Sequence, residues 1–188
     1  NVAFAGGDDA QVSESVDHTA VASGLAVQVG ANAVILSDGE GQYVEQSLNQ
    51  EAEAGTATVQ AGGNVVVGTI LTPWGGNNNG LTVNQDTNQV ANATDGPAVQ
   101  IAGNVLVAGG NGISATQTQT MQARSASWVI PNTGISVGTI QAGLNGAVIV
   151  GNNANINQTA TASTYSEGSV LQLFANIGEA TGTGTDYT

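Results

Sequence analysis

The side chains that could do chemistry in this chain are mainly carboxylates and carboxamides. The sequence holds 1 His and no Cys, and Arg124 is its only basic residue against 14 acidic ones. Nucleophilic catalysis needs a base beside a nucleophile, and such pairs are scarce here. Thiolate zinc sites are excluded because Cys is absent. We therefore expect a protein that is not an enzyme and has no catalytic residues.

Carboxylates stand close together in two kinds of place. Glu51 and Glu53 fall on the presumed solvent face of a strand, where they solubilise rather than form a glycosidase pair. Carboxylates in Gly-containing turns are candidate calcium ligands, namely Asp8, Asp9, Asp38 and Glu40. Neither turn has a full ligand set, so we assign no cofactor and keep calcium as the one candidate ion.

Charge and hydropathy limit the partners. A formal charge of −13 repels phosphate backbones, which argues against nucleic acid. No apolar run reaches membrane-spanning length, so membrane insertion is not expected. The chain starts at Asn1 without Met, which favours a mature form whose signal peptide has been removed. We expect an extracellular or cell-surface location.

The carboxamides follow a repeat in which an apolar residue and Gln precede Asn by a fixed spacing. The Gln and Asn are four positions apart in five copies, Gln28 and Asn32, Gln60 and Asn64, Gln100 and Asn104, Gln141 and Asn145, and Gln172 and Asn176. In a strand these two side chains share a face, and the residue between them is small in every copy but the last. The opposite face is Val-rich. We call these segments Gln-Asn strands.

A second segment, the Gln-Ala strand, alternates with the first. Val44, Gln46, Leu48, Gln50, Ala52 and Ala54 match Val83, Gln85, Thr87, Gln89, Ala91 and Ala93 position for position. An N-terminal copy has His18 where these have Gln50 or Gln89, so His18 is interpreted as a substitute within the repeat. The other face of these strands is polar and is expected to face water.

The chain therefore divides into five units, each a Gln-Ala strand followed by a Gln-Asn strand. The units run over about 10–37, 42–72, 81–110, 115–150 and 154–180, within one all-β domain spanning 1–188. Turn residues lie at each junction. A β-solenoid of about five two-strand repeats is favoured, and the alternative is an antiparallel β-sandwich built from five hairpin repeats.

In a solenoid, equivalent positions stack about 4.8 Å apart, so carboxamides can bond along a ladder and satisfy groups that are costly to bury. The residues expected in such ladders are Gln28, Asn32, Gln60, Asn64, Gln100, Asn104, Gln141, Asn145, Gln172, Asn176, Gln50, Gln89 and Gln158.

Gln and Asn on one strand face, with Gly between them and a Gln-bearing partner strand, resemble the curlin repeats of bacterial amyloid fibre subunits. These units are longer than curlin repeats, and the Gln-to-Asn spacing is one residue shorter. The resemblance implies export, assembly into curli-like, fimbria-like extracellular filaments, and roles in adhesion and biofilm matrix.

Both faces of the Gln-Asn strands are largely uncharged, so we expect neighbouring subunits to bury one of them. The expected function is a secreted structural subunit that self-associates into a homopolymer. We expect its last Gln-Asn strand, near Gln172, to pair with the first Gln-Ala strand, near Val16, of the next copy. Trp74 and Trp128 lie in the two longest interruptions and are the interface candidates.

Two other functions fit parts of the pattern. An ice-binding β-solenoid would use Thr at alternate positions, as at Thr116, Thr118, Thr120, Thr159 and Thr161, although acidic residues interrupt this face in other units. A surface adhesin or carbohydrate-binding module would use the exposed tryptophans as contacts.

Overall fold

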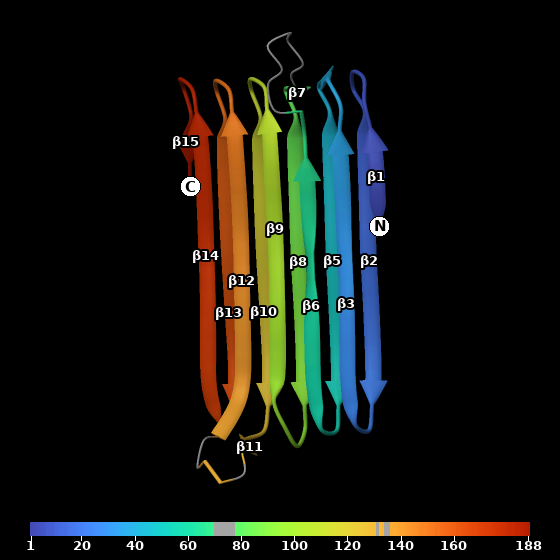
Figure 1. Ribbon diagram of the computed structural model, residues 1–188, viewed down its shortest axis with the longest axis vertical. Helices are drawn as coiled ribbons and strands as arrows, with labels where there is room; N and C mark the ends of the chain where they lie inside the picture. Colours follow the sequence, from blue (N-terminus) through green and yellow to red (C-terminus); the bar gives the residue numbers. More distant parts are fainter. Residues whose placement is uncertain (70–77, 131, 134–135) are drawn as a thin grey trace.

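The chain folds into two parallel β-sheets that lie face to face (Figure 1). The structure is a computed structural model that describes residues 1–69, 78–130, 132–133 and 136–188. Each unit contributes one long strand to each sheet, and successive units stack along the molecule from the first coil to the last. The predicted all-β solenoid is confirmed.

One sheet collects the Gln-Asn strands and is called the Gln-Asn sheet. Its members, in spatial order, are β1 (Val2–Ala5), β3 (Leu25–Leu36), β6 (Ala57–Val67), β9 (Ala98–Gly109), β12 (Ser136–Val150) and β14 (Ser169–Thr181). A short strand, β11 (Trp128–Val129), adds to β12.

The other sheet collects the Gln-Ala strands and is called the Gln-Ala sheet. Its members are β2 (Gln11–Ala22), β5 (Tyr43–Ala54), β8 (Thr82–Ala93), β10 (Ser114–Ser125), β13 (Asn155–Ser166) and β15 (Asp186–Tyr187). A separate pair, β4 (Gly39–Glu40) with β7 (Asn78–Asn79), lies among the turns.

The pairing between units excludes the hairpin sandwich. Every pairing between long strands is parallel, and each long strand pairs with the equivalent strand of the next unit rather than with its own chain neighbour. A hairpin would pair the two strands of one unit antiparallel. The two strands of a unit instead lie in different sheets and meet through their side chains.

The turns between coils need backbone conformations that few residues adopt. Asp9 and Asn153 have φ of 55° and 56°, and Gly41, Gly80 and Gly112 have φ of 66°, 67° and 68° at equivalent positions. Gly takes this left-handed region without strain, and Asn and Asp tolerate it better than other residues. This end of the solenoid, where each Gln-Asn strand leads into the next coil, is called the coil-junction end; in Figure 1 it is the upper end.

The interior changes character along the strands. Branched apolar side chains fill the coil-junction end, among them Leu36, Val44, Leu106 and Ile149. Ala fills the opposite end, as at Ala52 and Ala54. Buried Gln and Asn occupy the middle. The small side chains allow a thin core, as the composition predicted.

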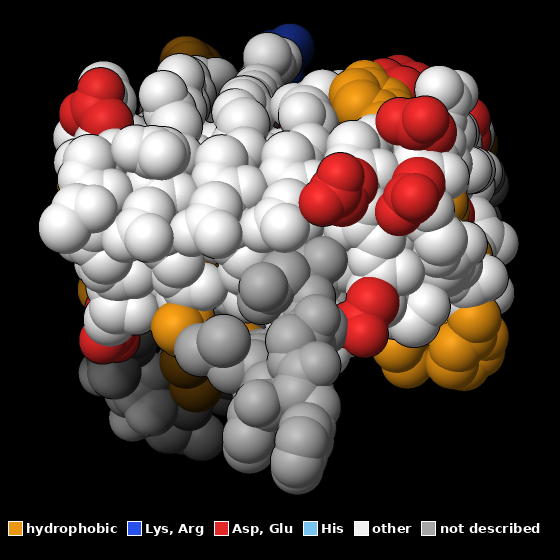
Figure 2. All heavy atoms as spheres, turned by 90° about the horizontal axis from the view of Figure 1, so that it is seen from above, with side chains coloured by type: hydrophobic (Ala, Val, Ile, Leu, Met, Phe, Trp, Pro, Cys, Tyr) orange, Lys and Arg blue, Asp and Glu red, His pale blue; other side chains and the backbone are white. Residues whose placement is uncertain are grey.

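The two outer faces differ in polarity. The Gln-Ala sheet turns Glu45, Glu51 and Glu53 to solvent, whereas the Gln-Asn sheet exposes Val29 and Leu173, at 70% and 59% of their surfaces. Figure 2, seen from the coil-junction end, shows carboxylates gathered over the first coils, on the right. No helix among the described residues is long and apolar enough to span a membrane.

Candidate functional site

Glutamines of the Gln-Asn sheet form a hydrogen-bonded ladder through the interior. The Nε2 of Gln60 donates to the Oε1 of Gln28 at 2.8 Å, and Gln172 donates to Gln141 at 2.7 Å. Gln100 and Gln141 continue the pattern, at 2.9 and 2.7 Å. Every amide in this ladder donates toward the N-terminal coil.

Asparagines four positions along the same strands form a second ladder of opposite direction. The Nδ2 of Asn32 donates to the Oδ1 of Asn64, and that of Asn145 to Asn176, both at 3.0 Å. Asn64 and Asn104 donate onward in the same way. Asn1, which the repeat pattern did not include, adds one more member by donating to Asn32 at 3.0 Å.

The Gln-Ala sheet contains two ladders of unequal length. Gln89 donates to Gln50 at 2.8 Å, whereas Gln158 lies in the other series, where it donates to Gln117 at 2.6 Å. That series continues through Gln85 and Gln46 to Glu14, whose Oε2 accepts from Gln46 at 3.0 Å. Gln46, Gln85 and Gln117 were not among the predicted ladder residues, although aligning the copies would have placed them beside Gln158.

The second N–H of these amides crosses between the sheets. Gln60 Nε2 also donates to the backbone carbonyl of Val90 at 3.0 Å, and Asn64 Nδ2 donates to that of Asp86 at 2.8 Å. A carboxamide has two N–H donors, and both are used here. The ladders therefore join neighbouring coils and also fix the register between the two sheets.

The ladder of Gln50 and Gln89 stops where the next coil lacks a carboxamide, and Gln119 is isolated for the same reason. The Oε1 atoms of Gln89 and Gln119 are buried without a partner. Their register partners toward the C-terminus are Met121 and Ala160, which offer no N–H. The ladders of the Gln-Asn sheet have no such interruption and reach both ends of the stack. The Gln-Ala ladder from Glu14 to Gln158 is also uninterrupted, and the hydroxyl of Tyr187 donates to the Oε1 of Gln158 at 2.8 Å.

A further ladder runs along the turns of the coil-junction end, and the sequence pattern did not identify it. The Oδ1 of Asn79 accepts the backbone N–H of Asn111 at 2.9 Å, and Asn111 accepts that of Asn152 likewise. Asn152 accepts from Thr183, and Asp8 from Glu40 at 3.0 Å. The signal was a polar residue before the left-handed position in successive turns.

The calcium candidates belong to this turn stack. The Oδ1 of Asp8 accepts the backbone N–H of Glu40, and the backbone carbonyl of Glu40 accepts the N–H of Asp9 at 2.7 Å. In the described part of the chain, no three His, Cys, Asp or Glu residues are grouped so that they could hold a metal ion. Asp8, Asp9, Asp38 and Glu40 are therefore placed as turn residues.

The other residues singled out from the sequence are spread over the molecule. His18 is in register with Gln50. Thr118 and Thr120 lie beside Thr159 and Thr161, but the preceding strand carries Asp86 and Asn88 in those positions. Trp74 lies outside the described residues, and the backbone of Trp128 pairs with that of Val137 in β11 and β12. The threonines therefore cover two strands only.

Asp86 lies on the polar outer face of the Gln-Ala sheet, in a hollow of about 250 Å³ that Glu45 also lines. Burial raises the pKa of its carboxyl, and a hydrogen bond from the backbone of Thr87 opposes that shift. Partial burial thus disfavours the charged form of Asp86, and a second acid shares its hollow.

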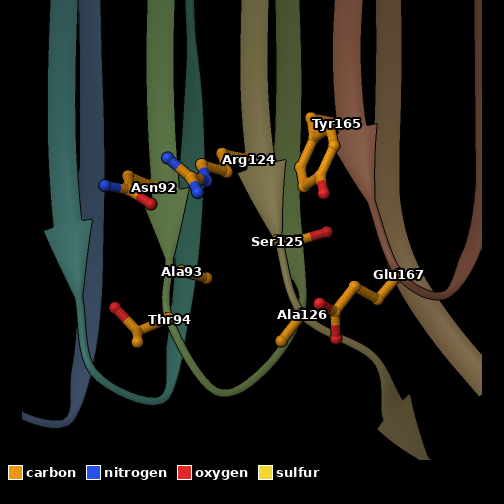
Figure 3. A pocket seen from close by; sticks show the side chains of 8 residues that line it. All are labelled: Asn92, Ala93, Thr94, Arg124, Ser125, Ala126, Tyr165 and Glu167. Carbon is orange, nitrogen blue, oxygen red and sulfur yellow. The ribbon is translucent and has the colours of Figure 1, made fainter.

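Another hollow lies at the opposite end of the same face. It has a volume of about 360 Å³ and is lined by Asn92, Ala93, Thr94, Arg124, Ser125, Ala126, Tyr165 and Glu167 (Figure 3). The guanidinium carbon of Arg124 lies 5.6 Å from the centre of the Tyr165 ring. The only basic side chain of the sequence is therefore held against an aromatic ring.

Both ends of the stack leave long strand edges unpaired. In the part of the chain that the structure describes, β14 has no neighbour beyond β12, and β2 has none beyond β5. β1 and β15 cover only parts of the edges of β3 and β13. Unpaired edges of this length are templates for pairing with another chain.

Comparison with known proteins adds no family to these observations. No protein-family model, no curated protein and no solved structure matches this chain.

Proposed function

We propose that this chain is a secreted structural subunit that self-assembles end to end into extracellular fibres or biofilm matrix. The observation that supports this most is that polar ladders run the length of the stack and stop, unfinished, at two open ends. A further copy is the partner whose strand spacing and side-chain pattern match those ends.

The two ladders of the Gln-Asn sheet favour head-to-tail stacking. At the last coil, both N–H groups of Gln172 are used, which leaves its Oε1 as an acceptor. Asn176 gives one N–H to the backbone of Gln158 and keeps one donor. At the first coil, Gln28 keeps one N–H, because the other donates to the backbone of Glu51.

Asn1 completes this match from the first coil. Its two N–H groups are used by Ser15 and Asn32, so its Oδ1 stays an acceptor. Asn176 of one copy can therefore donate to Asn1 of the next when the last coil faces the first, and Gln172 and Gln28 present an acceptor and a donor toward each other across the same junction. Two first coils placed together would oppose donor to donor and acceptor to acceptor.

The short terminal strands also complement each other. β1 extends the Gln-Asn sheet by part of one layer, and β15 extends the Gln-Ala sheet by part of one layer. Both lie near the coil-junction end. Because they belong to different sheets, β15 of one copy and β1 of the next fit in the same layer. The rest of that layer contains no strand of either copy.

This arrangement differs from the pairing expected from the sequence. Joining β14 to β2 would place a Gln-Asn strand against the Gln-Ala sheet. Continuing each sheet with its own strand type places β1 against β14 and β2 against β15. Asn1 then lies between Asn32 of its own copy and Asn176 of the preceding copy, so the asparagine ladder continues in register.

The outer face of the Gln-Asn sheet supports lateral contact between stacks. Val27, Val29, Ile101, Leu144 and Leu173 are each at least 40% exposed on this face. Extended exposed apolar surfaces on soluble proteins usually mark interaction sites. Side-by-side packing of stacks would remove this surface from water.

The test is to concentrate the purified protein, image it by negative-stain microscopy, and record fibre diffraction from aligned samples. We expect filaments with a meridional reflection at about 4.8 Å, because the strands lie across the stacking axis. A protein that stays monomeric in sedimentation at all concentrations, or filaments lacking that reflection, would contradict the proposal.

A further inference from the structure

The hollow around Arg124 has features that the fibre does not require. Arg124 lies on β10 and Tyr165 is its register partner on β13, both on the outer face of the Gln-Ala sheet. Tyr165 is 65% exposed. A cation stacked on a ring is held in place at a modest loss of side-chain freedom.

Three neighbouring strand ends shape this hollow. Asn92 and Thr94 come from the end of β8, Arg124 from β10, and Tyr165 and Glu167 from the end of β13. Ala93 and Ala126 also line it, and their short side chains leave space between the larger ones (Figure 3). Backbone pairing on both sides keeps the floor of the hollow rigid.

A second hollow adjoins the first. It measures about 430 Å³ and shares Asn92, Arg124 and Tyr165 with the first, and Gln122 and Ser163 also line it. The stacked Arg124 and Tyr165 therefore stand between two depressions. An elongated ligand could occupy both depressions and contact this pair at its middle.

Three polar side chains that line the hollow are free to bind, whereas the hydroxyl of Ser125 is bonded to Thr139 and Ser166. Among the described residues, the side chains of Arg124, Asn92 and Glu167 form no hydrogen bond or ion pair with the protein. In Figure 3, Arg124 and Asn92 lie on one side of the hollow and Glu167 on the other. A cation, an amide and a carboxylate thus surround a ring-sized space.

We propose that this hollow binds a carboxylated sugar, such as a hexuronic acid unit of a polysaccharide. The guanidinium of Arg124 is suited to a carboxylate, which it can hold through two parallel hydrogen bonds. Asn92, Thr94 and Glu167 offer donors and acceptors for hydroxyl groups. Tyr165 offers an apolar surface for the C–H groups of a sugar ring.

Charge narrows the ligand class. The net charge of −13 repels densely charged polyanions such as nucleic acid or polyphosphate. Nine of the acids lie at or before Glu53, and the nearest of them, Glu53, is in register with Asn92, two strands from Arg124. A single carboxylate therefore meets less repulsion at Arg124 than over the first coils. A polysaccharide with spaced carboxylates matches these conditions.

Calorimetric titration of the full chain with a hexuronic acid oligomer tests this proposal. A neutral glucose oligomer of the same length tests the need for the carboxylate, and inorganic phosphate tests simple anion attraction. We expect the hexuronic acid oligomer to bind and the other two probes to bind at least about tenfold more weakly, the value of one charge-assisted hydrogen bond pair.

Variants of exposed residues separate the contributions. Arg124→Gln and Tyr165→Ala should each weaken binding of the hexuronic acid oligomer by about tenfold or more, and Arg124→Lys by less, because Lys keeps the charge but not the planar pair of donors. Thr116→Ala, on the same strand and face but away from the hollow, should leave affinity unchanged. Circular dichroism confirms that each variant keeps its fold.

Three outcomes would overturn the proposal: no binding of the hexuronic acid oligomer, equal binding of phosphate or the neutral oligomer, or unchanged affinity in Arg124→Gln. The fibre proposal does not depend on this result, because Arg124 and Tyr165 lie on an outer face rather than on an open end. Assembly measured on the same variants should be unaffected.

Discussion

A buried carboxamide costs least in this interior when its donors and its acceptor all find partners. Gln100 shows the full arrangement, because its Nε2 donates to Gln60 and to the carbonyl of Gln122 while its Oε1 accepts from Gln141. Leaving a buried polar atom unpaired costs about 1–3 kcal/mol. The residue type at each ladder position is therefore set by its neighbours in the coils above and below.

Glu14 is the exception in its ladder, and it provides a prediction at this scale. It is 8% exposed and accepts from Gln46, but its side chain, unlike that of Gln, has no N–H to donate. Gln at this position would keep the acceptor and add an N–H directed at the facing sheet. We expect Glu14→Gln to raise the free energy of unfolding by about 1 kcal/mol, measured by urea denaturation.

The matched control is Glu45→Gln, on the solvent face of the next strand of the same sheet. Removing that exposed charge should change stability by only a few tenths of a kcal/mol. If both variants gain equally, the effect is general relief of negative charge, and the ladder explanation for Glu14 fails.

At the scale of elements, spacing alone predicted the strands and much of their register. Val44 to Ala54 was matched with Val83 to Ala93 position by position, and the structure pairs these residues in that register. Period-2 alternation and a repeated Gln are enough for this, because a slip of one residue would expose every carboxamide. Gln158 was wrongly grouped with Gln50 and Gln89, because its strand contains only one of the two glutamines of the repeat. Ala160 and Ala162 occupy the following core positions.

The ladder along the turns was not predicted, because in those segments only the Gly and Asn residues were recognised, as turn formers. A polar residue that accepts a backbone N–H from the next coil has no periodicity within its own segment. The hollow was missed for a related reason: Asn92, Arg124 and Tyr165 are far apart in sequence and are unlike one another in type. Only the stacking of three coils brings them together.

The small residue between Gln and Asn has a physical cause that gives a second prediction. A Cβ added to Gly143 would collide with the Oε1 of Gln119 and would lie 2.6 Å from the ring of Phe174, which fills the equivalent place in the last coil. Gly143→Ala should therefore destabilise the fold by about 2 kcal/mol, as overpacking of a core does.

The coupling between the two residues can be measured by a double-mutant cycle. The preceding coil already has Ala at the equivalent position, Ala102, so this position can hold a methyl group. Phe174→Ala removes the ring that crowds position 143 and should therefore accommodate Gly143→Ala. We expect the double variant to be more stable than the sum of the single effects by about 1 kcal/mol in thermal unfolding. Additive effects would show that Phe174 is not what restricts position 143.

At the scale of the whole molecule, stacking of coils turns a short repeat into a particle with two different ends. The interior ladders have direction, so the ends are complementary rather than alike. Sequence periodicity predicted the stack, but it could not reveal the direction of each ladder, which depends on how every amide is oriented. That direction is what makes head-to-tail assembly the specific expectation.

The terminal strands make the sharpest prediction at this scale. Deleting residues 1–5 removes β1, and deleting residues 182–188 removes β15 with its turn. Either deletion alone leaves one end stepped and the other flat, so stacked copies can continue one sheet but leave a gap in the other. We expect each single deletion to slow fibre growth, measured by light scattering and microscopy.

Both deletions together should restore the match, because two flat ends allow β2 to pair along β13 and β3 along β14. Gln28 could then donate to the free Oε1 of Gln172, and Asn176 to Asn32, over the whole length of the coil. The doubly shortened chain is expected to assemble faster than the intact one, which contacts its neighbour over only part of a layer. If the double deletion assembles no better than either single one, end-to-end stacking in this register is wrong.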